Sequence, residues 1–498
     1  MEVPNGAPRE EAVVIVRKGY AVTGKGSIRK ELEQLKYLFE PRSVAVIGAS
    51  RQPGTWGYQI LKNLIETGYQ GKIYPVNPRA TELLGLKVYP DVRAIPDEVD
   101  QAVVVVPAAI VPEVMEGCVE KGVKVATVIT AGFSETGPEG RKLEEKIVSI
   151  ARKGGIRIQG PNCMGTFVPR TKLNTTFTGA DSVPMKEGSV AFISQSGAFA
   201  GTMLRWAKGR SLGFSAAISI GNQADLEISD YLEYLCGADP HTKVVTLYIE
   251  GVKDGKKFMR ALEICNENRK PVVAMKLGYT PAGAEAAFSH TASLAGQDHV
   301  YNAVFKKYGV IRVYDFEDMF NIALIFSYLP LPKGDRVCVL SGGGGWSVEA
   351  SDALYSLGLK LPPLPKHIIE EVDTKRILPP FWNRRNPADL VATPDPEPYR
   401  VIAEMFLKED TCDIVMQVGG GIGLTPEQEE KSRENAKIIS NMAVKLGKPM
   451  VLVHNLGRAA PIAAIYEDNG IPVFTSPNKA ARAIRAMVDY AKHIGLIQ

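Results

Sequence analysis

The chain has few of the features that mark an exported, membrane-spanning or metal-binding protein. Its six cysteines are scattered without a CxxC pair, which argues against a zinc site and against a disulfide framework. No apolar run reaches the length of about 20 residues that crosses a membrane. The first residues include acidic side chains and no apolar signal core. We therefore expect a cytoplasmic protein whose thiols are buried in a reducing environment.

Charge of one sign is also scarce. A formal net charge of +4 on 498 residues is small, and no dense basic stripe of the kind found in nucleic-acid binders is present. The mildly basic balance still suits anionic small molecules as ligands. A chain of this length exceeds what one hydrophobic core usually holds, so we expect between two and four domains.

Short β-branched runs, each followed by a glycine-containing turn and a helical pattern, recur along the whole sequence. This alternation predicts an α/β fold with parallel sheets, and the continuous apolar character of the strands predicts helices on both faces. The expected strands fall into three sets: 43–50, 72–78, 101–107 and 124–130; then 188–197, 216–222, 243–251 and 270–278; then 335–345, 413–423 and 448–457.

The second and third sets resemble one unit used twice. A strand followed by Ser-x-x-Gly and a helix recurs at Ser194 and Ser341, and Lys-Pro before an aliphatic strand recurs at 270 and 448. The interval is longer in the third set, and we place the insertion in the Pro- and Arg-rich stretch 361–398. An internal repeat of this kind predicts two flavodoxin-like domains. The expected organisation is an N-terminal extension (1–35), a Rossmann-like domain (36–165), a flavodoxin-like domain (166–328) and a second flavodoxin-like domain (329–498).

The first candidate site is the turn after the first strand, where Gly48, Gly54 and Gly57 lead into a helix. Glycines there let the backbone approach a phosphate at the helix N-terminus, although the same turn could serve only to pack helix on sheet. A dehydrogenase would carry an acidic residue at the end of the second strand, whereas this strand ends with Asn77 and Arg79. The pattern disfavours NAD and favours a ligand with an extra phosphate, such as CoA or NADP.

The second candidate site follows the strand that begins the second set. Ser194 and Ser196 lie at a strand-to-helix junction, where hydroxyl and backbone N–H groups can hold an anion, or where a serine can simply cap the helix. Glu250 ends another strand of this set, and the carboxyl ends of parallel strands are where sites form in such sheets.

His290 is expected in a loop of small residues. It is either an ordinary surface histidine or a nucleophile for phosphoryl transfer. A nucleophilic histidine needs a carboxylate that fixes its tautomer, and Glu250 is the candidate. The third set has no counterpart of either residue. The repeat therefore separates shared scaffold from the two candidate catalytic residues.

Motifs spread from about residue 36 to the C-terminus, in order, carry a family resemblance. The chain resembles the α subunits of ADP-forming acetyl-CoA synthetases, in the superfamily of NDP-forming acyl-CoA synthetases that includes succinyl-CoA synthetase. The motifs are FEPRSVAVIGASRQPGTWGYQILKNL (39–64), VVVVPAAIVPEVMEGCVEKGV (103–123), TAGFSETG (130–137), GPNCMG (160–165), ISQSGAF (193–199), SIGNQADL (219–226), YIEGVKDG (248–255), SHTASLAG (289–296), SGGGG (341–345) and NPADL (386–390).

The resemblance implies a reversible reaction in which acyl-CoA, ADP and phosphate give acid, ATP and CoA through an acyl phosphate and a phosphohistidine. By motif match, His290 is the phosphohistidine and Glu250 is its stabilising carboxylate. The phosphate site would comprise Ser194, Gln195, Ser196 and Gly197. The CoA site would comprise Gly48, Ser50, Arg51, Gln52, Pro53, Asn77, Val106, Pro107, Thr130 and Asn162.

The family's ATP-grasp module has no match in this chain, since the part after residue 334 resembles a ligase-CoA domain. The resemblance therefore implies a separate β subunit that binds ADP or ATP with Mg²⁺, in an α₂β₂ assembly. The alternatives are a succinyl-CoA-synthetase-like α subunit for other acids, a non-catalytic CoA-binding sensor and, third, an NADP oxidoreductase. Nothing in the sequence decides the acyl group.

Overall fold

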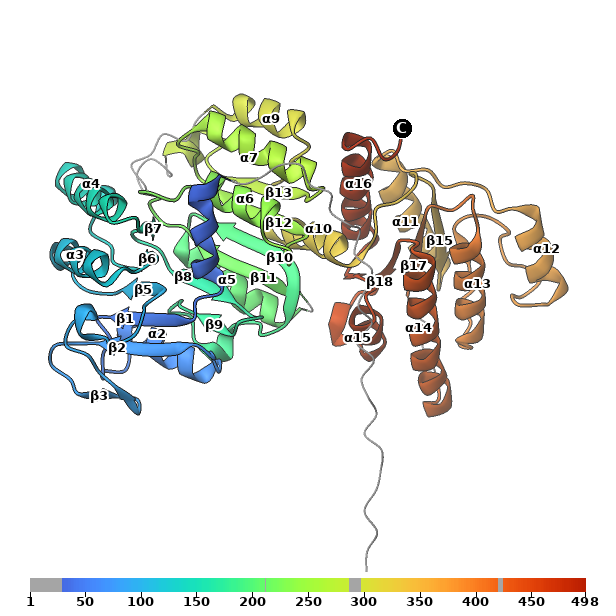
Figure 1. The fold of residues 1–498 in the computed structure, drawn as a ribbon. Coiled ribbons are helices and arrows are strands. Elements are labelled where there is room, and N and C mark those ends of the chain that lie inside the picture. Colours follow the sequence, from blue (N-terminus) through green and yellow to red (C-terminus); the bar gives the residue numbers. More distant parts are fainter. Residues whose placement is uncertain (1–28, 211, 286–296, 420–423) are drawn as a thin grey trace, which may run out of the picture.

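The computed structural model describes residues 29–210, 212–285, 297–419 and 424–498. Three main β-sheets run along the chain, each flanked by helices. The first two sheets lie together in one lobe, and the third forms the other lobe, with α10 and α16 between them (Figure 1). This arrangement confirms the predicted α/β class with parallel sheets.

The first sheet has five parallel strands in the order β2-β1-β5-β6-β7. The strand order reverses between β1 and β5, which makes this the topological switch point of the sheet. Ligands bind at such a switch point in open α/β sheets. The strands are buried apolar runs, as expected with helices on both faces. The elements are β1 (Ser43–Ile47), β2 (Lys72–Val76), β5 (Gln101–Val104), β6 (Val125–Val128), β7 (Arg157–Gln159), α2 (Trp56–Glu66), α3 (Val111–Lys121) and α4 (Pro138–Lys153), with a small hairpin of β3 (Glu82–Leu83) and β4 (Leu86–Lys87).

The second sheet has seven strands in the order β14-β13-β12-β10-β11-β8-β9. Its five parallel strands repeat the order of the first sheet, with the switch point between β10 and β12, while β8 and β9 add an antiparallel edge. The elements are β8 (Gly165–Val168), β9 (Leu173–Asn174), β10 (Glu187–Ser194), β11 (Phe214–Ser219), β12 (Val244–Ile249), β13 (Val272–Lys276), β14 (Ile311–Val313), α5 (Gly197–Lys208), α6 (Ile228–Gly237), α7 (Gly255–Glu267), α9 (Asp298–Lys307) and α10 (Phe316–Tyr328).

The third sheet repeats the same parallel order, as β16-β15-β17-β18-β19. This agreement supports the internal repeat inferred from the sequence. Residues 357–387 join α11 to β16, whereas α5 ends at Lys208 and β11 begins at Phe214, so the longer connection of the third sheet overlaps the predicted insertion at 361–398. The elements are β15 (Val337–Ser341), β16 (Ala388–Asp389), β17 (Ile414–Val418), β18 (Met450–Val453), β19 (Val473–Phe474), α11 (Gly344–Ser356), α12 (Lys366–Thr374), α13 (Glu397–Lys408), α14 (Pro426–Leu446), α15 (Pro461–Asp468) and α16 (Pro477–His493).

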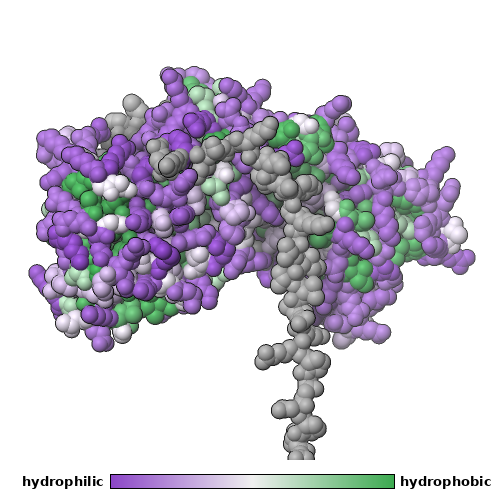
Figure 2. Space-filling model, in the orientation of Figure 1, coloured by the Kyte–Doolittle hydropathy of each residue, from purple (hydrophilic) through white to green (hydrophobic). Residues whose placement is uncertain are grey.

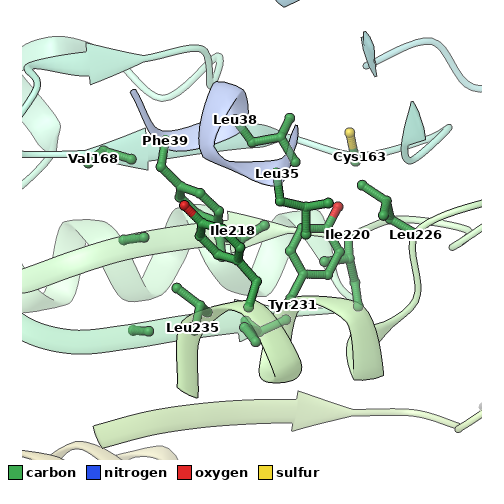
Figure 3. Packing of buried hydrophobic residues seen from close by; sticks show 14 of the residues in the cluster. Leu35, Leu38, Phe39, Cys163, Val168, Ile218, Ile220, Leu226, Tyr231 and Leu235 are labelled. Carbon is green, nitrogen blue, oxygen red and sulfur yellow. The ribbon is translucent and has the colours of Figure 1, made fainter. Parts of the chain in front are cut away.

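Residues 29–39 cover part of the second sheet. They form a short 3₁₀ helix (Lys30–Leu35) and α1 (Lys36–Phe39), and Leu35, Leu38 and Phe39 pack into one buried cluster with residues of β8, β11 and α6 (Figure 3). The Phe39 ring stacks on Tyr234 with centroids 5.2 Å apart. Arg29 donates hydrogen bonds to Asp230 and Glu233 on α6. This segment therefore belongs to the packed structure of the first two sheets.

A buried carboxylate links the first sheet to the second. Asp225 accepts hydrogen bonds from Arg152 Nε at 3.1 Å, from Arg157 Nε at 2.8 Å and from the backbone N–H of Ile158 at 2.9 Å. Its side chain is 1% exposed. Such a fully hydrogen-bonded buried charge is hard to remove, because its partners would be left uncompensated.

The outer surface is described by the distribution of its polar and apolar residues. The face in Figure 2 is mostly hydrophilic, with apolar residues in small separate groups. Within the described ranges, no helix is both long and apolar enough to cross a bilayer. All six cysteines are free and buried, as expected. In the same part of the chain, no cluster of three or more histidine, cysteine, aspartate or glutamate residues could hold a metal ion.

Candidate active site

Gly48 lies where β1 ends, at the switch point of the first sheet. Its φ of +93° is a conformation that favours glycine, and its N–H donates to the Val76 carbonyl at 3.1 Å. A Cβ at this position would lie 2.5 Å from the carbonyl oxygen of Val105. The turn therefore requires glycine at this point.

The loop after Gly48 is held by short polar contacts. Ser50 Oγ accepts the backbone N–H of Gln52 at 3.0 Å, and Asn77 Nδ2 donates to the Ala49 carbonyl at 2.7 Å. Arg51, Gln52 and Pro53 are exposed, as is Arg79 after β2. Two exposed arginines beside a glycine turn fit the phosphates of CoA, which carry several negative charges.

The remaining predicted CoA residues follow the next strands of the same sheet. Thr130 Oγ1 donates to the Val106 carbonyl at 2.7 Å, and Pro107 beside it is exposed. Asn162, with φ +55°, donates its backbone N–H to the Thr130 carbonyl at 2.9 Å. The ten residues predicted for CoA thus all lie along the C-terminal edge of the first sheet.

The predicted phosphate residues lie at the switch point of the second sheet. Ser194 is fully buried, and its hydroxyl donates to the Ser196 carbonyl at 2.7 Å. Ser196 caps α5, because its Oγ accepts the N–H of Phe199 at 3.3 Å. Gln195 reaches across to the end of β12, where its Nε2 donates to the Gly251 carbonyl at 2.8 Å and its Oε1 accepts the N–H groups of Gly251 (3.0 Å) and Glu250. The end of α5 and the backbone of Glu250 are therefore locked together.

The first turn of α5 begins with a glycine. Gly197 is its first residue, and the nearest atoms to a Cβ there would be Met164 Cβ and Ser219 Oγ, both at an ordinary 3.6 Å. Packing within the chain therefore does not require glycine. The first N–H groups of a helix have no partner inside it, and they attract anions.

The side chain of Glu250 is half-buried at the end of β12. Burial, together with the Glu250 charge, raises the pKa of nearby Tyr248 to about 12. The Tyr248 ring packs on Phe199 of α5 with centroids 4.2 Å apart. The charge of Glu250 thus acts on a phenol that packs against α5.

The two sheet edges meet through segments 160–164 and 219–223. The N–H of Met164 donates to Ser219 Oγ at 2.9 Å, and Asn162 Nδ2 donates to Asn222 Oδ1 at 3.3 Å. Lys253, in the loop after Glu250, donates its ammonium to the Gln223 carbonyl at 2.7 Å. The predicted CoA edge and the predicted phosphate edge thus form one continuous region.

Sequence reasoning missed several polar residues of this region. Asn222 Nδ2 lies 2.5 Å from Glu135 Oε2 and 2.9 Å from Glu144 Oε2. Burial acts to raise the pKa of Glu135, but the hydrogen bonds from Asn222 and from backbone N–H groups hold that pKa below its usual value. Asn222 and Glu135 fall in motifs that carried the family resemblance, which was the only signal available for them. A second missed residue is Lys276, a buried lysine at the end of β13.

His290 lies outside the described residues, which stop at 285 and resume at 297. The corresponding edge of the third sheet repeats the local scaffold, since Ser341 Oγ donates to the Gly343 carbonyl at 3.0 Å as Ser194 does to Ser196. Asp389 is the last residue of β16 there, but β17 ends at Val418 and is followed by Gly419, not by a carboxylate like Glu250.

Comparison with known proteins identifies both halves of this region. Residues 42–169 match the family model of a CoA binding domain, and residues 187–326 match that of a succinyl-CoA ligase like flavodoxin domain. The α subunit of acetate–CoA ligase (ADP-forming) I of Pyrococcus furiosus is 41% identical to this chain, over 92% of this chain and 98% of that protein. The α subunit of acetate–CoA ligase (ADP-forming) II of the same organism is 42% identical, over 93% of this chain and 99% of that protein.

A solved structure gives the same result. The Candidatus Korarchaeum cryptofilum dinucleotide-forming acetyl-coenzyme A synthetase 1, in complex with phosphate and ADP, superposes with a TM-score of 0.82 at 36% identity, covering 93% of this chain and 98% of that one. The match runs through all three sheets at an identity well above that of chance similarity. The chain therefore belongs to the family of ADP-forming acetate–CoA ligases.

Proposed function

We propose that this chain is the α subunit of an ADP-forming acyl-CoA synthetase and that His290 carries the phosphoryl group. The observation that carries the proposal is the adjacency of the two sheet edges. A thioester that reaches Asn162 from the glycine turn at Gly48 arrives beside Asn222, close to the first turn of α5 and Glu250. The reaction requires this juxtaposition, because phosphate must reach the thioester carbonyl.

In the first step, phosphate bound at the N-terminus of α5 attacks the thioester carbonyl. A C–O bond forms, the C–S bond breaks and CoA leaves as the thiolate, which gives an acyl phosphate. In the second step, an imidazole nitrogen of His290 attacks phosphorus and the acid leaves as a carboxylate. Glu250 accepts a hydrogen bond from the other ring nitrogen and stabilises the positive charge that the ring acquires.

The last step needs a partner. In the proposal, an ATP-grasp β subunit binds ADP with Mg²⁺, takes the phosphoryl group from His290 and forms an α₂β₂ assembly with this chain in the cytoplasm. The names of the Pyrococcus relatives, which are α subunits, support a partner of this kind. Acetate is the first acyl group to test, and other acids follow by the same chemistry.

The proposal is tested by incubating the chain with acetyl-CoA and radiolabelled phosphate. The chain should acquire an acid-labile label, and His290→Ala should abolish it. His299→Ala, which removes an exposed histidine on α9, is the matched control and should keep the label. A label that persists in His290→Ala would show that another residue carries the phosphoryl group. With a β subunit added, Glu250→Gln should retain CoA binding and lose most of the turnover.

A further inference from the structure

Lys276 is a buried lysine beside the candidate site. It ends β13 and is only 1% exposed. In the parallel pairing of β12 with β13 it lies opposite Ile249, the residue before Glu250. Its ammonium donates to the carbonyl of Leu277, a neutral acceptor. A lysine is almost never buried this deeply without an anionic partner, so its charge needs an explanation.

Four groups on three neighbouring elements face this ammonium within the described part of the chain. The Tyr301 ring on α9 lies 4.8 Å away, and its hydroxyl accepts the N–H of Val252, two residues after Glu250. Asp298 on α9 and Arg312 on β14 act on the same ammonium, as does Glu250. Burial is the largest effect and holds the pKa of Lys276 below its usual value, while Asp298 and Glu250 oppose this shift and Arg312 adds to it.

Asp298 is already neutralised. Arg312 donates to both of its carboxylate oxygens, at 3.0 and 2.6 Å, in a bidentate pair. Within the described residues, Glu250 is the second carboxylate whose charge acts on this ammonium. The register of β12 and β13 places Lys276 and Glu250 at neighbouring strand ends, at the edge where chemistry is proposed.

We propose that Lys276 is a positioning residue whose ammonium is the counter-ion of Glu250 and keeps this carboxylate ionised and in place. The inference rests on the proposed function, in which Glu250 must be ionised to accept a hydrogen bond from the imidazole. A phosphoryl group that arrives nearby adds negative charge and raises the proton affinity of a carboxylate. A fixed cation in a low-dielectric position offsets that effect.

The chain contains a matched control. Lys270 is also buried, in the segment that leads into β13 at the opposite edge of the same sheet. Its ammonium donates to the carbonyls of Leu235 at 2.7 Å and Asp239 at 2.6 Å, far from the strand ends that carry Glu250. A lysine with a purely structural role should behave like Lys270.

The test measures the rate at which the chain is phosphorylated from acetyl-CoA and labelled phosphate as a function of pH. In Lys276→Met, the acidic limb should move up by about one pH unit, which lowers the rate on that limb about tenfold. Lys276→Arg should restore the wild-type profile. Lys270→Met should keep the wild-type profile whatever it does to stability. Lys276→Gln replaces Lys276→Met if the latter does not fold.

A double variant separates action through Glu250 from an independent effect. Glu250→Gln with Lys276→Met should be no slower than Glu250→Gln alone, because the cation has no carboxylate left to serve. An unshifted profile in Lys276→Met and Lys276→Gln, or additive losses in the double variant, would overturn the inference while the labelled wild-type chain still upholds the proposed function. A wild-type chain that takes no label would overturn both.

Discussion

Replacing Gly197 by alanine tests whether glycine at this position is required for folding or for phosphate binding. Gly197 is the first residue of α5, and a Cβ there would lie 3.6 Å from its nearest neighbours, Met164 Cβ and Ser219 Oγ. Cα–Cβ bonds in a helix tilt toward its N-terminus, so the methyl group would point into the space where phosphate is proposed to bind. The variant should therefore fold normally and react slowly.

The variant should affect stability and reaction rate in opposite directions. Alanine is more favourable than glycine inside a helix by about 1 kcal/mol, and by less in the first turn, so the free energy of unfolding should be unchanged or slightly higher. The added methyl group would hold phosphate away from the N–H groups of the first turn, and the loss of one preorganised donor at an oxyanion costs on the order of 10²-fold in rate. We expect a similar loss at low phosphate concentration, which corresponds to about 2.7 kcal/mol of activation free energy.

The assay is phosphate-dependent labelling of the chain from acetyl-CoA, with urea unfolding measured in parallel. Gly255→Ala is the matched control, because Gly255 is the first residue of α7 on the same sheet and a Cβ there meets nothing within 4 Å. The control should show wild-type phosphate dependence. If Gly197→Ala also does, the N-terminus of α5 is not the phosphate site and this reasoning is refuted.

Three further predictions concern the scaffold. Gly48→Ala should weaken CoA binding at least about tenfold in calorimetry, because its Cβ would lie 2.5 Å from the Val105 carbonyl; unchanged affinity would place CoA elsewhere. Asp225→Ala should lower the free energy of unfolding in urea by about 3 kcal/mol, and a loss below the error of the measurement would mean that its partners find other acceptors. Burial alone would raise the pKa of Asp100, but hydrogen bonds from Arg42 hold it below its usual value. The ionised Asp100 therefore stabilises the fold above the usual carboxylate pKa, and this stabilisation is lost as the pH falls through the lowered pKa of the folded state. Arg42→Ala should move the onset of acid unfolding, followed by circular dichroism, to higher pH.

The parts of the fold that the sequence predicts are those with local signals. The parallel strands are continuous apolar runs between turn residues, and the residues after them had to lie at sheet edges. The short antiparallel β8 and β9 carry little periodicity, so nothing in the sequence marked them as strands. The packing of residues 29–39 on α6 also depends on tertiary contacts, such as the stacking of Phe39 on Tyr234.

The candidate site divides in the same way. Ser194, Glu250 and the glycine turn follow strands directly, so their placement at the edges could be predicted. Lys276 is predicted from the sequence only as the polar end of a strand, and its contact with Tyr301 depends on the packing of α9 against that strand end. The hydrogen bond between Asn222 and Glu135 joins two different sheets, and no spacing in the sequence indicates it. Positions that depend on the meeting of distant elements require the structure.

The cores of the three sheets also constrain how the proposed reaction can proceed. One apolar cluster joins residues of the first and second sheets, and another joins the second and third, where Phe326 of α10 meets Tyr490 of α16 edge-to-face at 5.6 Å. Separating any two sheets would expose many buried side chains at about 1.5–3 kcal/mol each. The sheets therefore keep their mutual positions, and the predicted CoA edge stays beside the N-terminus of α5. In the proposed reaction, the phosphoryl group must then reach the nucleotide on a carrier residue rather than through rotation of one sheet against another.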